Sequence, residues 1–261
     1  MTNLKTALIT GASSGLGAEF ARQLASQGCN LILTARRQSR LEALAQELQS
    51  QFPVAIDILV ADLANNADMQ AVAEYIRQHP SLDLLVNNAG FGTNGRFSQV
   101  DPSKHAAMLQ VHVNASVLLS HAALPGMLAR RQGYIINMAS MAGLIPIRNV
   151  LYGTTKAFLV NFSEALQAEL RGKGIKIQAL CPGFTYTEFH ETPEYIEFNR
   201  RKIPRLLWLS SEQVVRESLA HLERRTVICI PGFQYKLIGM VARNNLSGYI
   251  VRKIGARLFH K

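Results

Sequence analysis

Cysteine is scarce in this chain of 261 residues, and the three cysteines lie far apart in apolar segments, at Cys29, Cys181 and Cys229. They form no CxxC pair and no other spacing typical of metal ligands. The histidines also lack partners at zinc-ligand spacing, so helix-surface or partly buried positions are expected for His79, His105, His112, His121 and His221. We therefore predict free thiols in the reducing cytoplasm and no metal site.

Long hydrophobic runs are also missing, although 48% of the residues are hydrophobic. No stretch reaches the roughly 18 consecutive apolar residues that typify a transmembrane helix. Residues 1–6 show no charged segment followed by an apolar run, so a signal peptide is not expected. Internal repeats, low-complexity segments and Pro/Gly/Ser-rich linkers are absent as well. These absences predict one soluble domain that is not secreted.

Acidic residues are outnumbered, with 18 Asp and Glu against 28 Lys and Arg, and the formal net charge is +10. Six of the positive charges lie within residues 236–261, which contain no acidic residue. Apolar residues recur there at intervals of four, at Leu246, Ile250, Ile254 and Leu258. This spacing predicts a basic amphipathic helix over 246–259.

The basic segment has three interpretations. It makes peripheral membrane contact through residues 246–261, packs against another subunit, or closes the chain's own substrate cleft. A nucleic-acid partner is not expected, because the sequence contains no recognisable module for reading DNA or RNA.

Short β-branched runs alternate with longer segments of helical period. The predicted strands cover 4–10, 30–36, 56–61, 82–87, 133–138, 175–180 and 226–230. The predicted helices cover 15–27, 39–51, 66–78, 103–131, 151–171 and 211–224. Apolar strands such as Asp83-Leu84-Leu85-Val86 indicate burial on both faces. We predict an α/β fold, a doubly wound (Rossmann) parallel sheet of about seven strands flanked by helices, with a crevice at the strands' carboxyl ends.

Residues 184–210 break this alternation, because Pro193 and Pro204 flank a charged and aromatic stretch that is long for a connection. Such an insertion after a strand is a candidate lid over the crevice. Its aromatic residues either line a hydrophobic substrate pocket or simply pack the lid down; they are Phe184, Phe189, Phe198 and Trp208. We predict a catalytic domain over 1–235 that includes this lid, followed by a basic amphipathic C-terminal extension at 236–261.

A glycine-rich turn, Thr10-Gly11-Ala12-Ser13-Ser14-Gly15-Leu16-Gly17, follows the first predicted strand and opens a helix. Glycines at such a turn let the backbone approach a pyrophosphate, and the helix N-terminus offers free N–H groups to it. A glycine triplet alone also fits a plain tight turn. The strand before it and the helix after it favour a dinucleotide site.

The second predicted strand ends in Arg36 and Arg37, where a site selective for NAD would place a carboxylate on the ribose. Two guanidiniums can instead bind a 2′-phosphate, which favours NADP(H) as the cofactor. The alternative is that both arginines belong to a solvated loop.

Tyr152 and Lys156 are four residues apart and therefore share one helix face. A nearby cation stabilises phenolate, so we expect the pKa of Tyr152 to fall from about 10 toward neutrality. Ser140 follows the strand at 133–138 and could hold a substrate oxygen beside Tyr152. Asn114 is a weak helix former inside the helix at 103–131, and either faces the crevice or is exposed.

Taken together, these motifs resemble the short-chain dehydrogenase/reductase family over residues 4–232. The matching blocks are Thr10–Gly17, Asp62-Leu63, Asn87-Asn-Ala-Gly90, Asn114, Ser140, Tyr152-x-x-x-Lys156 and Pro182-Gly183. Each block alone is a weak signal, whereas their order and spacing together are specific.

The resemblance implies a catalytic tetrad of Asn114, Ser140, Tyr152 and Lys156. Tyr152 would be the acid/base, Lys156 would also bind the nicotinamide ribose, and Asn114 would anchor a water in a proton relay. It also implies that Asp62 meets the adenine, Asn88 borders the ribose and 182–187 lies along the nicotinamide. The full implied cofactor set is Gly11, Ser13, Ser14, Gly15, Leu16, Gly17, Arg36, Arg37, Asp62, Leu63, Asn88, Ala89, Gly90, Tyr152, Lys156, Pro182, Gly183, Thr185 and Thr187.

The predicted function is an NADP(H)-dependent oxidoreductase that interconverts an alcohol and a carbonyl by hydride transfer. The apolar lid and tail favour a lipophilic ketone or aldehyde. A dinucleotide-binding regulator or redox sensor without turnover is the alternative, but it would need no proton-transfer pair. The resemblance further suggests a homodimer or homotetramer built on the helices at 103–131 and 151–171.

Overall fold

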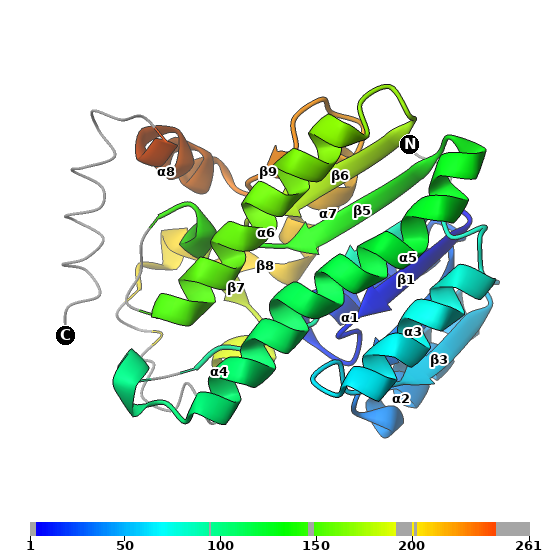
Figure 1. Cartoon of the computed structure of the whole chain (residues 1–261), viewed down its shortest axis with the longest axis horizontal. Helices are drawn as coiled ribbons and strands as arrows, with labels where there is room; N and C mark the ends of the chain where they lie inside the picture. Colours follow the sequence, from blue (N-terminus) through cyan, green and yellow to red (C-terminus); the bar gives the residue numbers. More distant parts are fainter. Residues whose placement is uncertain (1–3, 94, 146–148, 192–199, 201–202, 244–261) are drawn as a thin grey trace.

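The computed structural model describes residues 4–93, 95–145, 149–191, 200 and 203–243 (Figure 1). Seven parallel strands form one sheet in the order β3-β2-β1-β4-β5-β6-β9. Their bounds are β1 Thr6–Thr10, β2 Asn30–Ala35, β3 Ile56–Val60, β4 Leu84–Asn87, β5 Gly133–Met138, β6 Ile175–Leu180 and β9 Ile228–Cys229. The predicted doubly wound sheet is confirmed, with strand ends that differ from the expected ones by at most two residues.

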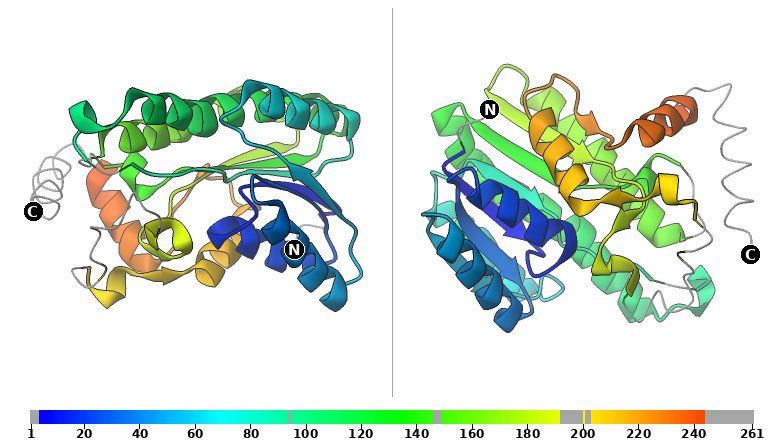
Figure 2. Two further views of the ribbon diagram at one scale, coloured as in Figure 1. Left: turned by 90° about the horizontal axis from the view of Figure 1, so that it is seen from below. Right: turned by 180° about the vertical axis from the view of Figure 1, so that it is seen from behind.

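Helices cover both faces of this sheet, as Figures 1 and 2 show. One face carries α1 Gly15–Ala25, α2 Gln38–Gln51 and α7 Ser211–His221, and the other carries α3 Asn66–Gln78, α5 Ala115–Arg130 and α6 Val150–Glu169. Alternate strand residues feed two separate cores: Ile9 and Val86 belong to the first, and Leu8 and Leu85 to the second. The apolar strands are therefore buried on both faces, as a parallel sheet requires.

The helix predicted over 103–131 is not continuous. It consists of α4 Pro102–Leu109, a π-helical turn η2 Gln110–Asn114, and α5. In the turn, the backbone N–H of Ala115 bonds to the carbonyl of Gln110, five residues back. By length and composition Pro102–Arg130 could cross a membrane, but half of its most apolar stretch is buried inside the protein. It packs as a core helix of this domain.

Several elements have no counterpart among the predictions. Two short parallel strands, β7 Thr185–Tyr186 and β8 Leu209–Ser210, pair within the segment expected to be a lid. Helix α8 Phe233–Arg243 spans the expected domain boundary at residue 235. Single turns of 3₁₀ helix are η1 Phe97–Gln99, η3 Met141–Gly143, η4 Glu188–Glu191 and η7 Arg205–Leu207. The predicted amphipathic helix at 246–259 lies outside the described residues.

The order of the strands reverses between β1 and β4, because β1 leads outward to β2 while β4 leads outward to β5. Strands β1 and β5 both run toward the side on which β7, β8 and α8 lie (Figure 1). In open parallel sheets, ligands bind beyond the carboxyl ends at such a reversal point. The fold therefore directs attention to the segments that follow β1, β4 and β5.

Candidate active site

The glycine-rich turn after β1 is tied to the segment after β4. Gly11 and Gly15 adopt positive φ angles of 65° and 54°, which residues with a Cβ rarely adopt. A Cβ on Gly17 would lie 2.3 Å from the Gly11 carbonyl oxygen, so the α1 helix start packs directly against the turn. The side-chain amide of Asn88 donates to the Thr10 carbonyl at 2.8 Å. The result is a backbone cradle at the N-terminus of α1, which suits a pyrophosphate.

Thr10 makes the second connection between these segments. Its hydroxyl oxygen accepts the backbone N–H groups of Asn88 and Ala89 at 2.8 and 2.9 Å. Gly90 follows and is exposed at the surface of the crevice. The implied cofactor residues of the two turns therefore lie together, and their contacts with a cofactor stay predictions.

The two arginines after β2 differ in their surroundings. Arg37 donates to the hydroxyl of Ser13 at 3.0 Å and to that of Ser14 at 2.7 Å. Arg36 points away from the turn, with 72% of its side chain exposed and a guanidinium nitrogen 3.8 Å from the Asp62 carboxylate. Arg37 is thus the arginine held at the glycine-rich turn.

Asp62 and Leu63 follow β3 at the same edge. The Asp62 carboxylate accepts the backbone N–H of Ala64 at 3.0 Å, and Leu63 is buried in the core. One carboxylate oxygen of Asp62 is used in this turn, and the other faces Arg36. Both residues border the place where the resemblance puts the adenine.

The segment after β6 lies across the glycine-rich turn. Pro182 is buried, and its carbonyl accepts the backbone N–H of Met141 at 3.0 Å. A Cβ on Gly183 would collide with the Tyr235 ring, whose hydroxyl accepts the backbone N–H of Phe184 at 2.9 Å. Helix α8, which contributes Tyr235, therefore anchors the first part of this segment.

Its second part reaches the arginine side of the turn. The hydroxyl of Thr185 donates to the Gly183 carbonyl, and Thr187 lies where a Cβ on Gly15 would touch it at 3.3 Å. Glu188 forms ion pairs with Arg40 at 2.6 Å and with Arg37 at 3.5 Å. A carboxylate of the chain itself thus neutralises the guanidinium that is held at the turn.

Three of the four implied tetrad residues come together. Ser140 lies two residues after β5 and caps η3, where its side-chain oxygen accepts the backbone N–H of Ala142 at 3.1 Å. Its hydroxyl hydrogen-bonds with the Tyr152 phenol. Asn149 caps α6 by accepting the backbone N–H of Tyr152. Lys156 Nζ donates to the Met138 carbonyl at 2.7 Å and lies 5.6 Å from the centre of the Tyr152 ring. This arrangement can hold a substrate oxygen and move a proton to or from it.

Burial dominates the electrostatics of this group. It lowers the pKa of Lys156 to about 7. Burial also raises the pKa of Tyr152 to about 12, although the hydrogen bond from Ser140 opposes the rise. The expected fall toward neutrality is therefore wrong for the structure as it stands, because the cost of burying a phenolate exceeds the stabilisation from its neighbours. Tyr152 is held as a neutral phenol, ready to donate a proton.

Asn114 lies in the π-helical turn η2, which rotates the residues after Gln110 relative to a continuous helix. It is exposed, and its side-chain amide donates to the Gln110 side-chain oxygen at 2.6 Å, one turn earlier. A crevice open to solvent leaves its lining residues exposed as well, so the place of Asn114 in the tetrad stays a prediction.

His112, from the same π-helical turn, faces Tyr152. It is 1% exposed, and its ring meets the Tyr152 ring edge-on at a centroid distance of 5.9 Å. The sequence predicted a helix-surface or partly buried histidine without a special role. The one signal in the sequence that could have pointed to a role in the site is the position of His112, two residues before Asn114.

Aromatic side chains from the lid segment gather near the group. Tyr186 stacks against Trp208 at a centroid distance of 4.8 Å, and Phe184 contacts Trp208 in a tilted arrangement at 5.4 Å. The Phe189 ring lies 5.9 Å from the Tyr152 ring. Phe198 lies outside the described residues. Phe189 is thus in contact with the site, while Trp208 holds β7 and β8 together.

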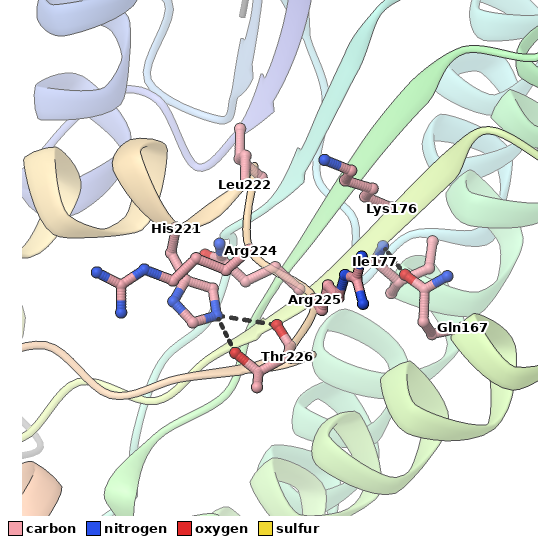
Figure 3. Close-up of a pocket in the computed structure, with 9 residues that line it drawn as sticks. Gln167, Lys176, Ile177, His221, Leu222, Arg224, Arg225 and Thr226 are labelled. Atoms are coloured by element: carbon pink, nitrogen blue, oxygen red, sulfur yellow. Dashed lines mark hydrogen bonds between the residues drawn. The ribbon is translucent and has the colours of Figure 1, made fainter. Parts of the chain in front are cut away.

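A separate pocket lies at the opposite end of the sheet, beside the amino ends of β6 and β9 (Figure 3). Its lining comes from the start of β6 and the turn before β9, where His221 contacts the Thr226 carbonyl at 2.9 Å. It is remote from the carboxyl ends of the strands and from Tyr152. Within the described part of the chain, no group of three or more His, Cys, Asp or Glu side chains could hold a metal ion.

Comparison with known proteins agrees with this geometry. Residues 5–194 match the short chain dehydrogenase family. A short-chain dehydrogenase from Sphingobium yanoikuyae in complex with NADPH superposes with a TM-score of 0.83 at 33% identity, over 94% of this chain and 96% of that one. The bulky-bulky ketone specific alcohol dehydrogenase from Comamonas testosteroni gives a TM-score of 0.80 at 32% identity, over 95% of each chain.

A sequence relative of named activity is serine 3-dehydrogenase from Agrobacterium fabrum. It is 37% identical over 187 residues, which are 70% of this chain and 73% of that protein. The chain belongs to the short-chain dehydrogenase/reductase family and is an oxidoreductase that acts on alcohol or ketone substrates with a nicotinamide dinucleotide.

Proposed function

We propose that this enzyme reduces a lipophilic ketone or aldehyde with NADPH. The observation that carries the proposal is the Tyr152 phenol, hydrogen-bonded to Ser140 and close to Lys156, at the end of the sheet where the glycine-rich cradle lies. A cofactor bound along Gly11–Gly17 would supply hydride to the carbonyl carbon.

The chain's own residues handle the oxygen. Ser140 is placed to donate a hydrogen bond to the carbonyl oxygen and so to orient it. Tyr152 then donates its phenolic proton to that oxygen as hydride arrives at the carbon. Lys156 lies close enough to stabilise the phenolate that remains, and a proton from solvent restores the phenol. The raised pKa of Tyr152 supports the reducing direction, since the acid form is the one present near neutral pH.

Arg37 supports the preference for NADPH. Its guanidinium lies over the hydroxyls of Ser13 and Ser14, so a 2′-phosphate on the adenosine ribose would meet a cation and two donors together. Arg36 is placed to contribute from the side of Asp62. Both contacts remain part of the proposal.

The test is titration of the purified protein with NADPH and then NADH, followed by nicotinamide fluorescence. Arg37→Ala should weaken NADPH binding about 10- to 150-fold and leave NADH binding unchanged, because one charge-assisted contact is worth about 1.5–3 kcal/mol. Arg36→Ala should show a smaller loss in the same direction. Arg77→Ala is the matched control, since Arg77 pairs with Glu74 on the surface of α3. Equal affinity of the wild type for both cofactors would remove the preference.

The substrate class rests on the apolar side of the site. Phe189 borders Tyr152, and the named activity of the Comamonas enzyme toward bulky-bulky ketones supports a roomy apolar pocket. A screen should therefore find turnover with aromatic or long-chain ketones before sugars. The alternative of a dinucleotide-binding regulator predicts NADPH binding with no turnover of any carbonyl in that screen.

We also propose a homodimer or homotetramer built on α5 and α6. Both helices expose large apolar side chains, among them Val117 and Phe158. Light scattering of the purified protein tests this, and a monomer at micromolar concentration would contradict it.

Peripheral membrane contact is the proposed role of the C-terminal region of this cytoplasmic enzyme. Helix α8 exposes Phe233, Leu237 and Met240 on one face. From its last residue the sequence continues as a segment, 243–261, that contains basic and no acidic residues. Cosedimentation with vesicles of anionic phospholipid should exceed that with neutral phosphatidylcholine vesicles. Phe233→Ser with Met240→Ser should reduce it without changing turnover of a soluble substrate.

A further inference from the structure

His112 joins two segments that the site needs in register. Its Nε2 accepts the backbone N–H of Phe91 at 3.0 Å, in the segment that continues from Asn88-Ala89-Gly90. Its Nδ1 lies 2.9 Å from the hydroxyl oxygen of Thr155, in the turn of α6 between Tyr152 and Lys156. Because Nε2 accepts, the hydrogen of a neutral imidazole is on Nδ1, and Nδ1 donates to Thr155.

Thr155 links His112 to Tyr152. Its hydroxyl donates to the backbone carbonyl of Tyr152 at 2.9 Å. An unbroken series of hydrogen bonds therefore runs from Phe91 through His112 and Thr155 to the residue that carries the phenol. Both ring nitrogens of His112 are engaged in it, so the histidine has no free nitrogen with which to carry a proton.

The charges around His112 keep it neutral. Burial lowers its pKa well below the usual range, and the Lys156 cation acts in the same direction. The faces and edges of the ring meet Phe91, Tyr152 and Gly90, none of which is a carboxylate. Protonation at Nε2 would in addition break the hydrogen bond from Phe91.

Gly90 shows how closely the two segments approach. A Cβ at Gly90 would lie 2.9 Å from Nε2 of His112 and 3.6 Å from Nζ of Lys156. Only a residue without a side chain leaves the histidine ring and the lysine amine where they are. The segment implied to border the cofactor thus touches both His112 and Lys156.

We propose that His112 is a positioning residue, which holds the segment after β4 at a set distance from the α6 turn that carries Tyr152 and Lys156. The inference rests on the proposed function, because it assigns His112 to the alignment of the proton donor with the bound cofactor. Misplacement of reacting groups by about 1 Å can cost about 100-fold in rate.

The test separates the two hydrogen bonds. His112→Phe keeps the ring volume and removes both bonds. His112→Gln places an acceptor near the position of Nε2 and keeps only the bond from Phe91. His112→Asn places a donor near the position of Nδ1 and keeps only the bond to Thr155. His79→Gln is the control, because His79 contacts the Tyr75 carbonyl at 2.7 Å at the end of α3, away from the site.

We expect kcat for NADPH-dependent reduction to fall about 10- to 100-fold in His112→Phe, with KM for the carbonyl changed less than about threefold. Gln and Asn should each recover part of the loss. Thr155→Val should resemble His112→Gln, because both variants keep the bond from Phe91 and lose the bond between residues 112 and 155. Combining Thr155→Val with His112→Phe should cost less than the two losses multiplied, since both act through one series of bonds. Thr155→Val also serves as the second route to the answer if His112→Phe does not fold.

The pH profile of kcat distinguishes positioning from other roles. A purely structural role would lower thermal stability in proportion to the loss and leave the profile unchanged. With positioning, the alkaline limb of the reduction profile moves, because the segment after β4, which lies against Lys156, changes its distance from the α6 turn and so alters the surroundings of Tyr152 and Lys156. A wild-type kcat and profile in His112→Phe would overturn the inference. So would the disappearance of an acid limb in all three variants, which would identify His112 as a proton carrier.

Tyr152→Phe measured alongside keeps the two hypotheses apart. If Tyr152→Phe loses turnover while His112→Phe matches the wild type, only the role of His112 fails. If Tyr152→Phe turns over normally, the proposed mechanism fails irrespective of His112.

Discussion

The two halves of the crevice hold their polar groups in opposite ways. On the cofactor side, Arg37 and Glu188 leave nearly half of their side chains exposed, at 44% and 47%. On the proton-transfer side, Lys156 and His112 are almost completely buried, at 3% and 1%. Charges in contact with water are screened and can change partner at little cost, whereas buried ones are committed to one geometry. Substitutions on the buried side should therefore have the larger effects.

The largest effect is expected at Tyr152. Tyr152→Phe removes the phenolic hydroxyl, and with it the proton donor and the hydrogen bond with Ser140. We therefore expect kcat to fall about 10²- to 10⁴-fold, the usual contribution of a general acid. Fluorescence titration should show NADPH bound as tightly as by the wild type. Turnover close to that of the wild type would exclude Tyr152 as the proton donor and remove the contrast between the two halves.

The next effect is expected at the glycine-rich turn. Gly17→Ala places a Cβ 2.3 Å from the Gly11 carbonyl oxygen and 2.6 Å from the Asn88 amide nitrogen. The turn must move, so we expect a loss of about 1–3 kcal/mol in the free energy of unfolding and a marked loss of NADPH affinity. Gly28→Ala is the control, because Gly28 has a φ of 79° but nothing within 4 Å of its Cβ position. Gly28→Ala thus measures the cost of a positive φ alone, whereas Gly17 has no positive φ and its loss comes from the close approach. Wild-type stability and NADPH affinity in Gly17→Ala would show that the turn tolerates the added Cβ.

Lys156 sharpens the comparison through pH. Its pKa is lowered to about 7 in the folded protein, so the unfolded chain binds more protons between that pH and the ordinary lysine value of about 10.4. The free energy of unfolding therefore rises with pH across this window, because the folded protein no longer has to bury a charged Lys156. Lys156→Met should raise the free energy of unfolding by about 1–2 kcal/mol at pH 6.

The gain should shrink as the pH rises toward 9, and chemical denaturation at several pH values measures it. Lys176→Met, at an exposed ion pair with Glu223, is the control and should show no such trend. A gain independent of pH would mean that Lys156 is not destabilised by burial.

The smallest effect is expected at Glu188. Arg40 lowers the pKa of its carboxyl, and the Glu188 side chain pairs with both Arg40 and Arg37. Glu188→Gln releases Arg37 for a 2′-phosphate, so NADPH affinity should rise about two- to fivefold, in line with the worth of a surface ion pair. Titration with NADH should show no change. An equal gain for both cofactors would separate Glu188 from the phosphate position and weaken the distinction drawn for the cofactor side.

Sequence patterns predicted most of the scaffold. Short β-branched runs located all seven strands of the main sheet, and α3, β5 and β6 have the predicted bounds. The glycine-rich turn, Ser140, Tyr152 and Lys156 lie where the order of the motifs suggested, and their chemical roles stay predictions. Short elements such as β7 and β8 were missed, because two residues contain no period to detect.

What the sequence determined by itself is local: the periods of helices and strands, the positive φ angles of Gly11 and Gly15, and the spacing of Tyr152 and Lys156. Each depends on residues within one or two turns of chain. The tertiary structure alone decided that His112 enters the site, and that the pKa of Tyr152 rises. The first depends on a π-helical turn whose extra residue is stabilised by packing on α6 and the segment after β4. The second depends on burial by surrounding segments far away in the chain, such as the one that carries Phe189.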